Sequence, residues 1–370
     1  MKYAPFLKPE GRIGFVAPSF GCNIEPYRSA FENALKTFRN MGYTTVLGPN
    51  CYEGSGIGIS NTPEACAKEL MEYYTADDNH VLISCGGGEL MCEVLDHMDF
   101  DRIRKTQPKW YMGFSDNTNM TFLLATIADT ASLYGPCAAA FGMEPWHPAL
   151  KDAFDILCGN GKNCAVDAGK TFVLRGYDKW ERMSVKDEEH PLAPYQVTEQ
   201  SVLRYYAPDC MEPVLITNQP AAPVEAQKEI TSFSGRLLGG CVDCLVNLLG
   251  TRFDHVQEFQ KRYADDGILW YLECCDLNVM SIRRAMWQMK NAGWFQHAKG
   301  FLIGRPLCHG QEMFGLDQYH AVIDILKDYQ VPVVMDLDIG HIPPMMPIIC
   351  GSMGDVTLYE NGMTLAMHCE

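Results

Sequence analysis

Short apolar segments, each followed by turn residues and then by a helical pattern, constrain the fold of this chain most strongly. In the first part of the chain such segments lie at Arg12–Pro18, Thr44–Leu47, His80–Ser84 and Trp110–Met112. Helical patterns fill the intervals, and one of them begins where Thr62 precedes Pro63, a capping residue followed by a residue suited to the first turn. Strands that alternate with helices predict a mostly parallel sheet covered by helices on both faces.

The second half of the chain begins with a region of weaker pattern. Charges, prolines and turn residues dominate between residues 176 and 230. Regular patterns return with strands at Ile268–Leu272 and Phe301–Gly304, a helix at Ser281–Ala292 and a hairpin around Asn361-Gly362. A chain of 370 residues usually exceeds a single core. We therefore expect an N-terminal domain over residues 1–165, a connecting excursion over 166–230 and a C-terminal domain over 231–370.

Charge and composition narrow the range of partners. The formal net charge of −16 opposes general binding to the phosphate backbone of nucleic acids. No apolar run reaches the length of about 20 residues that spans a bilayer, and the first residues lack the pattern of a secretory signal. The 16 cysteines are scattered and many lie in apolar runs, which is typical of buried, reduced thiols. These features predict a cytoplasmic protein without a nucleic-acid or membrane partner.

A candidate nucleophile lies where a strand turns into a helix, in the segment Gly113-Phe114-Ser115-Asp116-Asn117. A serine at such a corner projects its hydroxyl above the sheet edge, beside N–H groups at the positive end of a helix. This arrangement suits an attacking oxygen and the oxyanion that it creates. A helix cap explains the same residues, because serine and aspartate are good N-terminal residues.

A glycine-rich turn, Cys85-Gly86-Gly87-Gly88, follows another strand. Ligands of open parallel sheets bind at the carboxyl ends of the strands, so this turn and the Ser115 turn are expected to face one pocket. The turn lacks the spacing of a dinucleotide-binding fingerprint, and a routine strand–helix connection explains it as well. No cofactor is expected.

A serine nucleophile requires a base and an acid that orients it. His341 lies in a rigid, irregular segment before two prolines, and His309 is its rival. Glu273 ends an apolar strand, where an unpaired carboxylate would be costly to bury, and Asp276 is the nearby alternative.

Short motifs punctuate nearly the whole chain. In order they are Val16-Ala17-Pro18-Ser19, Gly86-Gly87, Pro108-Lys109, Gly113-Phe114-Ser115-Asp116, Tyr134-Gly135-Pro136, Leu238-Gly239-Gly240, Leu249-Gly250-Thr251, Leu272-Glu273, Gly304-Arg305-Pro306 and Gly340-His341. Their order and spacing resemble the serine LD-carboxypeptidase family, which includes the microcin C self-immunity proteins.

This resemblance implies a fold, a catalytic set and an assembly. The fold would pair an N-terminal parallel-sheet domain of the Rossmann or flavodoxin-like type with a smaller C-terminal β-rich α/β domain, swivelling or barrel-like. The triad would be Ser115, Glu273 and His341, completed across the two domains. The oxyanion would be held by the N–H groups of Asp116 and of the Gly86-Gly87 turn. Members are typically homodimers and need no metal.

Two departures from the family pattern bear on the substrate. Cys85 stands where the carboxypeptidases commonly have arginine, and Cys241 replaces the asparagine of the usual Gly-Gly-Asn. The missing arginine and the Gly304-Arg305-Pro306 motif resemble the immunity-protein branch, which cleaves the amide of a peptidyl- or aminoacyl-nucleotide-like substrate. The alternatives are an LD-carboxypeptidase that releases a D-amino acid from muropeptides and a small-molecule binding module without catalysis.

Three further features have both a functional and a structural interpretation. Trp180 and the neighbouring Tyr177 could stack on a flat substrate group or pin a loop to the core. Arg305 could bind a carboxylate or phosphate or form a structural ion pair. Cys241 and Cys244 have a metal-like spacing, but without a second pair they predict a helix with two buried thiols and no metal.

Overall fold

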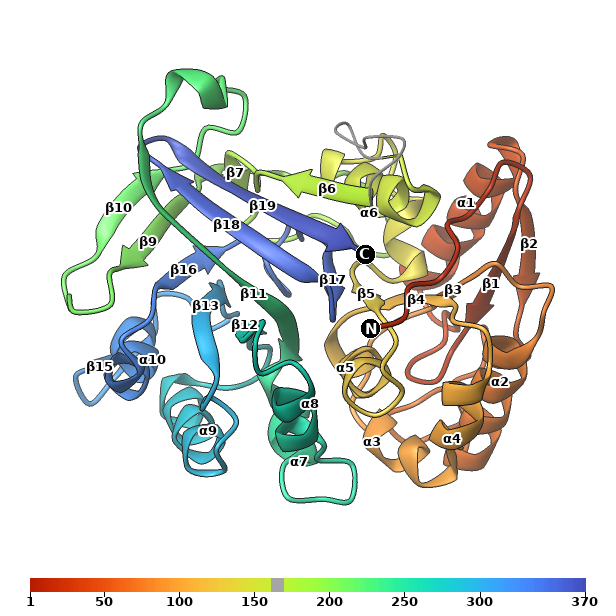
Figure 1. Cartoon of the computed structure of the whole chain (residues 1–370). Coiled ribbons are helices and arrows are strands. Elements are labelled where there is room, and N and C mark those ends of the chain that lie inside the picture. Colours follow the sequence, from red (N-terminus) through yellow and green to blue (C-terminus); the bar gives the residue numbers. More distant parts are fainter. Residues whose placement is uncertain (161–169) are drawn as a thin grey trace. The chain divides into compact units, whose positions relative to one another are not determined.

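The computed structural model describes residues 1–160 and 170–370 (Figure 1). The chain forms two compact units of similar length. The first comprises Met1–Gly161, Met183–Gln196 and Pro347–Gly351, and the second comprises Lys162–Arg182, Val197–Met346 and Ser352–Glu370. The predicted domain boundary at residues 165 and 166 lies outside the described residues.

The first unit contains a six-stranded sheet in the order β17-β5-β4-β3-β1-β2. Its strands are β1 (Arg12–Val16), β2 (Thr44–Leu47), β3 (Val81–Ser84), β4 (Trp110–Gly113), β5 (Ser132–Tyr134) and β17 (Ile348–Cys350). All neighbours pair in parallel except β17, which is antiparallel to β5. The order 2-1-3-4-5 is that of flavodoxin-like folds, with a switch point between β1 and β3, so the predicted fold of this unit is confirmed.

Helices cover both faces of this sheet (Figure 1). They are α1 (Tyr27–Asn40), α2 (Pro63–Thr75), α3 (Met91–Val94), α4 (Phe100–Lys105), α5 (Thr118–Thr126) and α6 (Pro148–Cys158), with 3₁₀ turns at Leu95–His97, Ser115–Asn117 and Ala138–Gly142. The expected cap of α2 is present, because the Thr62 hydroxyl accepts from the Ala65 N–H at 3.3 Å. Aromatic rings hold α1 and α6 together, with the Phe38 and Phe154 centroids 5.4 Å apart.

The second unit contains a nine-stranded mixed sheet in the order β10-β9-β16-β13-β12-β11-β18-β19-β6. Its strands are β6 (Lys170–Leu174), β9 (Val202–Tyr206), β10 (Val214–Thr217), β11 (Glu229–Cys241), β12 (Ile268–Glu273), β13 (Ala298–Gly304), β16 (Val333–Leu337), β18 (Met353–Tyr359) and β19 (Gly362–Cys369). The central strands β11, β12, β13 and β16 are parallel, and the flanking strands are antiparallel. Strands β18 and β19 form the hairpin predicted around Asn361-Gly362.

The smaller elements of the second unit complete its layers. They are the helices α7 (Val242–Leu248), α8 (Val256–Arg262), α9 (Val279–Asn291) and α10 (Gln318–Leu326), the 3₁₀ turns Val224–Ala226 and Lys327–Tyr329, and the two-residue strands β7 (Lys179–Trp180), β8 (Glu199–Gln200), β14 (Glu312–Met313) and β15 (Leu316–Asp317). Helix α9 is capped by Asn278, whose side chain accepts from the Ser281 N–H at 2.9 Å.

The sequence-based picture of the second half needs two corrections. The region 166–230 is more than a connecting excursion, because it supplies β6, β9 and β10 to the nine-stranded sheet. The predicted β-rich C-terminal domain is confirmed, but it is not smaller than the first unit, and its sheet is open, with β10 and β6 at the edges, rather than barrel-like.

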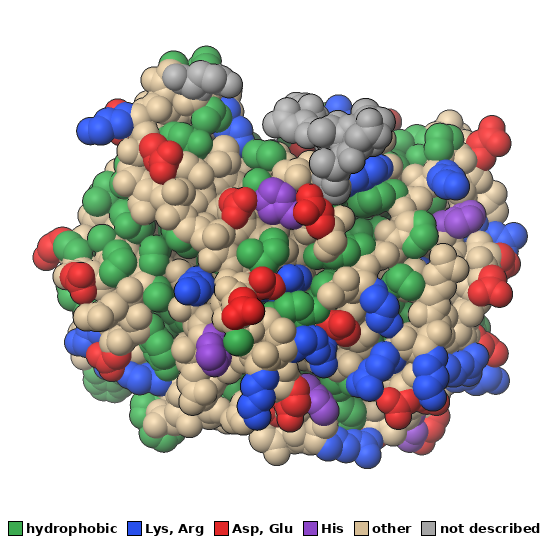
Figure 2. All heavy atoms as spheres, viewed as in Figure 1, with side chains coloured by type: hydrophobic (Ala, Val, Ile, Leu, Met, Phe, Trp, Pro, Cys, Tyr) green, Lys and Arg blue, Asp and Glu red, His purple; other side chains and the backbone are tan. Residues whose placement is uncertain are grey.

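Acidic, basic and hydrophobic side chains are interspersed on the face seen in Figure 2. Among the described residues, no helix combines the length and hydrophobicity that crossing a membrane requires.

Candidate active site

Ser115 lies where the chain leaves β4 and enters the 3₁₀ turn Ser115–Asn117 that leads into α5. Its backbone has a φ of 62°, in the left-handed region that non-glycine residues seldom adopt. Such strained positions persist where the surrounding structure holds them, and they cluster at functional sites. This positive φ sets the corner apart from an ordinary helix cap, which has a β-region backbone.

The glycine turn after β3 lies directly against Ser115. A Cβ atom built on Gly87 would lie 3.1 Å from Ser115 Oγ, so a side chain there would press on the hydroxyl. The Asn117 side chain donates to the Gly86 carbonyl at 2.8 Å, and the Ser115 N–H donates to the Tyr134 hydroxyl at 3.3 Å. The two turns at neighbouring strand ends thus face each other, as the sequence predicted.

Asp116 fixes this corner to the loop that follows β1. Its carboxylate accepts from the Ser19 hydroxyl at 2.6 Å, from the Met91 N–H at 3.0 Å and from the Asn119 side chain at 3.0 Å. Burial raises the pKa of Asp116 to about 6, although these hydrogen bonds lower it. Asp116 is therefore a structural anchor through its side chain.

In the second unit, Glu273 ends β12 and is in register with Cys241, the last residue of β11. Backbone packs tightly around the Glu273 side chain. A Cβ on Gly340, which has a φ of 102°, would lie 2.4 Å from Glu273 Oε2, and a Cβ on Gly304 would lie 3.0 Å from Glu273 Cβ. These positions require glycine, and they hold the carboxylate in one orientation.

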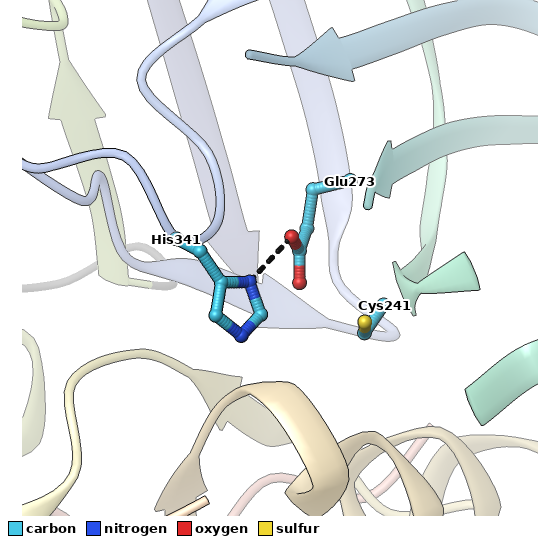
Figure 3. Close-up of side chains that lie close together, drawn as sticks. All are labelled: Cys241, Glu273 and His341. Carbon is cyan, nitrogen blue, oxygen red and sulfur yellow. Dashed lines mark hydrogen bonds and ion pairs between the residues drawn. The ribbon is translucent and has the colours of Figure 1, made fainter. Parts of the chain in front are cut away.

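His341 meets Glu273 as the sequence predicted. Its Nδ1 atom lies 2.8 Å from Glu273 Oε2 (Figure 3). Burial by itself lowers the pKa of His341, but the Glu273 charge and hydrogen bonds with Cys275 and Glu273 outweigh it and raise the pKa well above 6.5. The contact with the Cys275 thiol had no signal in the sequence.

Cys241 completes a cluster with these two residues. Its Sγ atom, a Glu273 oxygen and a His341 nitrogen all lie within 4.8 Å of one another (Figure 3). This cluster is one that could hold a metal ion. Cys244 lies on α7, and both cysteines are buried, as the sequence predicted.

The rival residues have other contacts. His309 packs edge-on against Trp180, with centroids 5.2 Å apart, and burial lowers the pKa of this histidine. The Asp276 N–H donates to Asp243 at 2.9 Å, and Asp276 is exposed. The hydrogen bond between His341 and Glu273 favours this pair over either rival.

Arg305 and Trp180 belong to the interior of the second unit. Arg305 forms an ion pair with Asp338 at 2.7 Å, and both side chains are at most 2% exposed. Its guanidinium lies 5.4 Å from the centre of the Trp180 ring, which is buried. These contacts support the structural interpretation of both residues, and their roles in substrate binding remain predictions.

Comparison with known proteins adds two kinds of similarity. Residues 13–135 match the LD-carboxypeptidase N-terminal domain, and residues 234–356 match the LD-carboxypeptidase C-terminal domain. A putative carboxypeptidase of Treponema pallidum (strain Nichols) is 22% identical over 98% of this chain and 94% of its own length. A putative carboxypeptidase of Vibrio cholerae is also 22% identical, over 96% and 95% of the two chains.

Solved structures share the fold. The microcin C7 self immunity protein MccF in complex with aspartyl sulfamoyl adenosine matches with a TM-score of 0.77 and 18% identity, over 100% of this chain and 99% of its own. An MccF-like protein from Bacillus anthracis matches with a TM-score of 0.75 and 17% identity, over 100% of both chains. The N-terminal and C-terminal domains of the family both match, in that order along the chain, and the chain belongs to the LD-carboxypeptidase family of serine peptidases.

Proposed function

We propose that this peptidase hydrolyses an amide bond with Ser115 as nucleophile, His341 as general base and Glu273 as the carboxylate that orients the base. We further propose that its substrate is an aminoacyl- or peptidyl-nucleotide-like molecule. Family membership gives the class of enzyme. The residue roles and the substrate are the proposal.

The observation that carries the proposal is the backbone of Ser115. A φ of 62° at the strand–helix corner turns the hydroxyl toward the glycine turn after β3, where Gly87 leaves room for it. We assign the oxyanion to the N–H groups of Asp116 and of the Gly86-Gly87 turn. Losing one such donor typically lowers the rate by about 100- to 1,000-fold.

The His341–Glu273 pair supplies the proton chemistry. Because Nδ1 lies 2.8 Å from the Glu273 carboxylate, we assign the proton to Nδ1, which leaves Nε2 as the acceptor. In the proposed cycle His341 takes the Ser115 proton as the hydroxyl attacks the carbonyl. It then protonates the leaving amine, and water releases the acyl group from the serine.

We infer the substrate class from the lack of a positive charge at the position before Gly86-Gly87. In this chain the position before Gly86-Gly87 holds Cys85, which is completely buried and carries no cation for the terminal carboxylate of a muropeptide. Structures with this fold include MccF with aspartyl sulfamoyl adenosine and an MccF-like protein of Streptococcus pneumoniae with AMP. The second candidate is an LD-carboxypeptidase acting on muropeptides, which the names of the curated relatives favour.

A paired hydrolysis assay tests this proposal. Wild type and Ser115→Ala are offered aspartyl sulfamoyl adenosine and an LD-linked muropeptide tetrapeptide. We expect the wild type to cleave the nucleotide analogue and the variant to cleave neither. Cleavage of the tetrapeptide alone would transfer the function to the second candidate, and equal cleavage by both proteins would refute the role of Ser115. A homodimer and a cytoplasmic location stay predictions.

A further inference from the structure

Three segments that are distant in the sequence bring a thiol, a carboxylate and an imidazole together in the second unit. Cys241 and Glu273 are register partners at the carboxyl ends of the parallel strands β11 and β12. His341 follows β16 and places Nδ1 2.8 Å from Glu273 Oε2. One donor atom of each residue lies within 4.8 Å of the other two (Figure 3).

We propose that the cluster of Cys241, Glu273 and His341 is a binding site for a thiophilic divalent cation of the Zn²⁺ class. Thiolate sulfur, imidazole nitrogen and carboxylate oxygen are the ligands that zinc takes in proteins, and three such ligands leave a fourth position for water. Hard cations such as Mg²⁺ and Ca²⁺ prefer oxygen ligands alone, so the thiol selects against them.

The geometry is close to that of such a site. Zinc bond lengths of about 2.0–2.3 Å place tetrahedral donors about 3.3–3.6 Å apart. Donors that now lie within 4.8 Å need to approach by roughly 1.5 Å at most, while Nδ1 and Oε2 at 2.8 Å need to separate slightly. The cation would take the place of the proton that His341 and Glu273 share, and the Cys241 thiol would release one proton on binding.

The surroundings would orient these ligands. Gly304 and Gly340 confine the Glu273 side chain. The Cys241 thiol lies 3.4 Å from Asp243 Oδ2, and Asp243 is itself held by the Cys275 N–H at 3.0 Å. Partners behind the ligands tune metal affinity in this way.

Cation binding has a consequence for the reaction, and this consequence rests on the proposed function. A cation on Nδ1 leaves the proton on Nε2, and a cation on Nε2 occupies its lone pair. In either case His341 cannot accept the Ser115 proton. The bound cation would therefore inhibit the peptidase reversibly, and a chelator would restore the activity.

Cobalt titration of the whole protein tests the site without any substrate. We expect one Co²⁺ per chain with a thiolate-to-Co²⁺ charge-transfer band in the near ultraviolet. Cys241→Ser and Cys241→Ala should abolish the band and weaken binding by roughly 100-fold or more, and His341→Gln should weaken binding as well. Cys210→Ser removes an exposed thiol and serves as the matched control, which should keep the band.

The outcomes separate the two proposals. An unchanged band in both Cys241 variants, with their folds verified by circular dichroism, or the absence of binding below millimolar Co²⁺, would overturn the cation site. The hydrolysis rate of each protein with the cation is compared with the rate of the same protein in chelator. If the cation binds and this rate does not fall, the inhibitory consequence is overturned. If the metal-free enzyme hydrolyses no substrate, the proposed function fails, and the absorbance titration still decides the cation site.

Discussion

The first unit positions its candidate nucleophile by backbone conformation, whereas the second positions its candidate base by pairing it with a buried carboxylate. Ser115 stands at a φ of 62° beside a glycine turn. His341 is held by the Glu273 carboxylate at 2.8 Å. Both arrangements lie at the carboxyl ends of parallel strands, yet changes to them should have different consequences. Substitutions in the first unit should act through steric clashes and backbone strain, whereas substitutions in the second should act by changing electrostatic interactions.

The largest effect is expected from Ser115→Ala. Removing the nucleophile should lower kcat by about 10⁴- to 10⁶-fold, because the remaining groups cannot form the acyl-enzyme. Single-turnover and steady-state kinetics measure this loss, with Ser29→Ala, on a surface helix of the same unit, as the control. Because the triad is proposed to act as a unit, Ser115→Ala/His341→Ala should be hardly slower than Ser115→Ala. If the rate losses of the two single substitutions multiply in the double variant, Ser115 and His341 do not act as a unit.

The next effect is expected from Glu273→Gln. The variant keeps the volume but removes the charge that orients the His341 ring, so kcat should fall by about 10³- to 10⁴-fold with a small change in KM. Glu69→Gln is the matched control in the first unit. That buried carboxylate accepts from the Ala17 and Asn50 N–H groups, each at 2.8 Å, so its loss should lower stability rather than kcat. If Glu69→Gln lowers kcat as much as Glu273→Gln does, the buried charge of Glu273 matters only for folding and not for orienting His341.

Arg305→Met tests whether the second unit also uses buried charge for stability. The change leaves the Asp338 carboxylate buried without its partner, which typically costs about 3–5 kcal/mol of unfolding free energy. Denaturant unfolding measures this loss, and Arg283→Met, which removes a partly exposed pair with Asp324, should cost much less. Normal stability with a raised KM would instead assign Arg305 to substrate binding.

A smaller effect is expected from Gly87→Ala in the first unit. The added Cβ would lie 3.1 Å from Ser115 Oγ and displace the hydroxyl, so kcat should fall by roughly 10- to 100-fold while stability changes little. Gly42→Ala is the contrasting variant. Its φ of 92° makes alanine strained, but no atom lies within 4 Å, so only thermal stability should fall. A full rate in Gly87→Ala would mean that the glycine turn does not face the reacting atoms.

The smallest effect is a displacement of the pH profile. The pKa of His341 is raised well above 6.5 despite burial, chiefly by the Glu273 charge, so kcat/KM should increase with pH through this raised value. Glu273→Gln should move the limb to lower pH. The same shift contributes stability that is present below the unfolded pKa of about 6.5 and is lost as pH rises through the folded value. If the rise of kcat/KM occurs at the same pH in Glu273→Gln, the group that titrates there is not His341.

The sequence determined the local elements and the choice of candidate site residues. Strands β1 to β4, the cap of α2 and the closing hairpin follow from apolar periodicity and turn residues, which act between neighbours in the chain. Ser115, Glu273 and His341 could be chosen as candidates because each follows or ends a strand, a position where ligands of parallel sheets bind.

Only the tertiary structure decided which distant residues meet. The return of Pro347–Gly351 to the first unit, the entry of β9 and β10 into the second sheet and the pairing of Arg305 with Asp338 all depend on contacts between segments far apart in the chain. The same holds for Cys241. The sequence offers no second cysteine pair to join Cys241 and Cys244 in a metal site, but the register of β11 with β12 sets Cys241 beside Glu273. Strand register is fixed by burial and pairing across the whole sheet, and a single sequence carries no local signal for it.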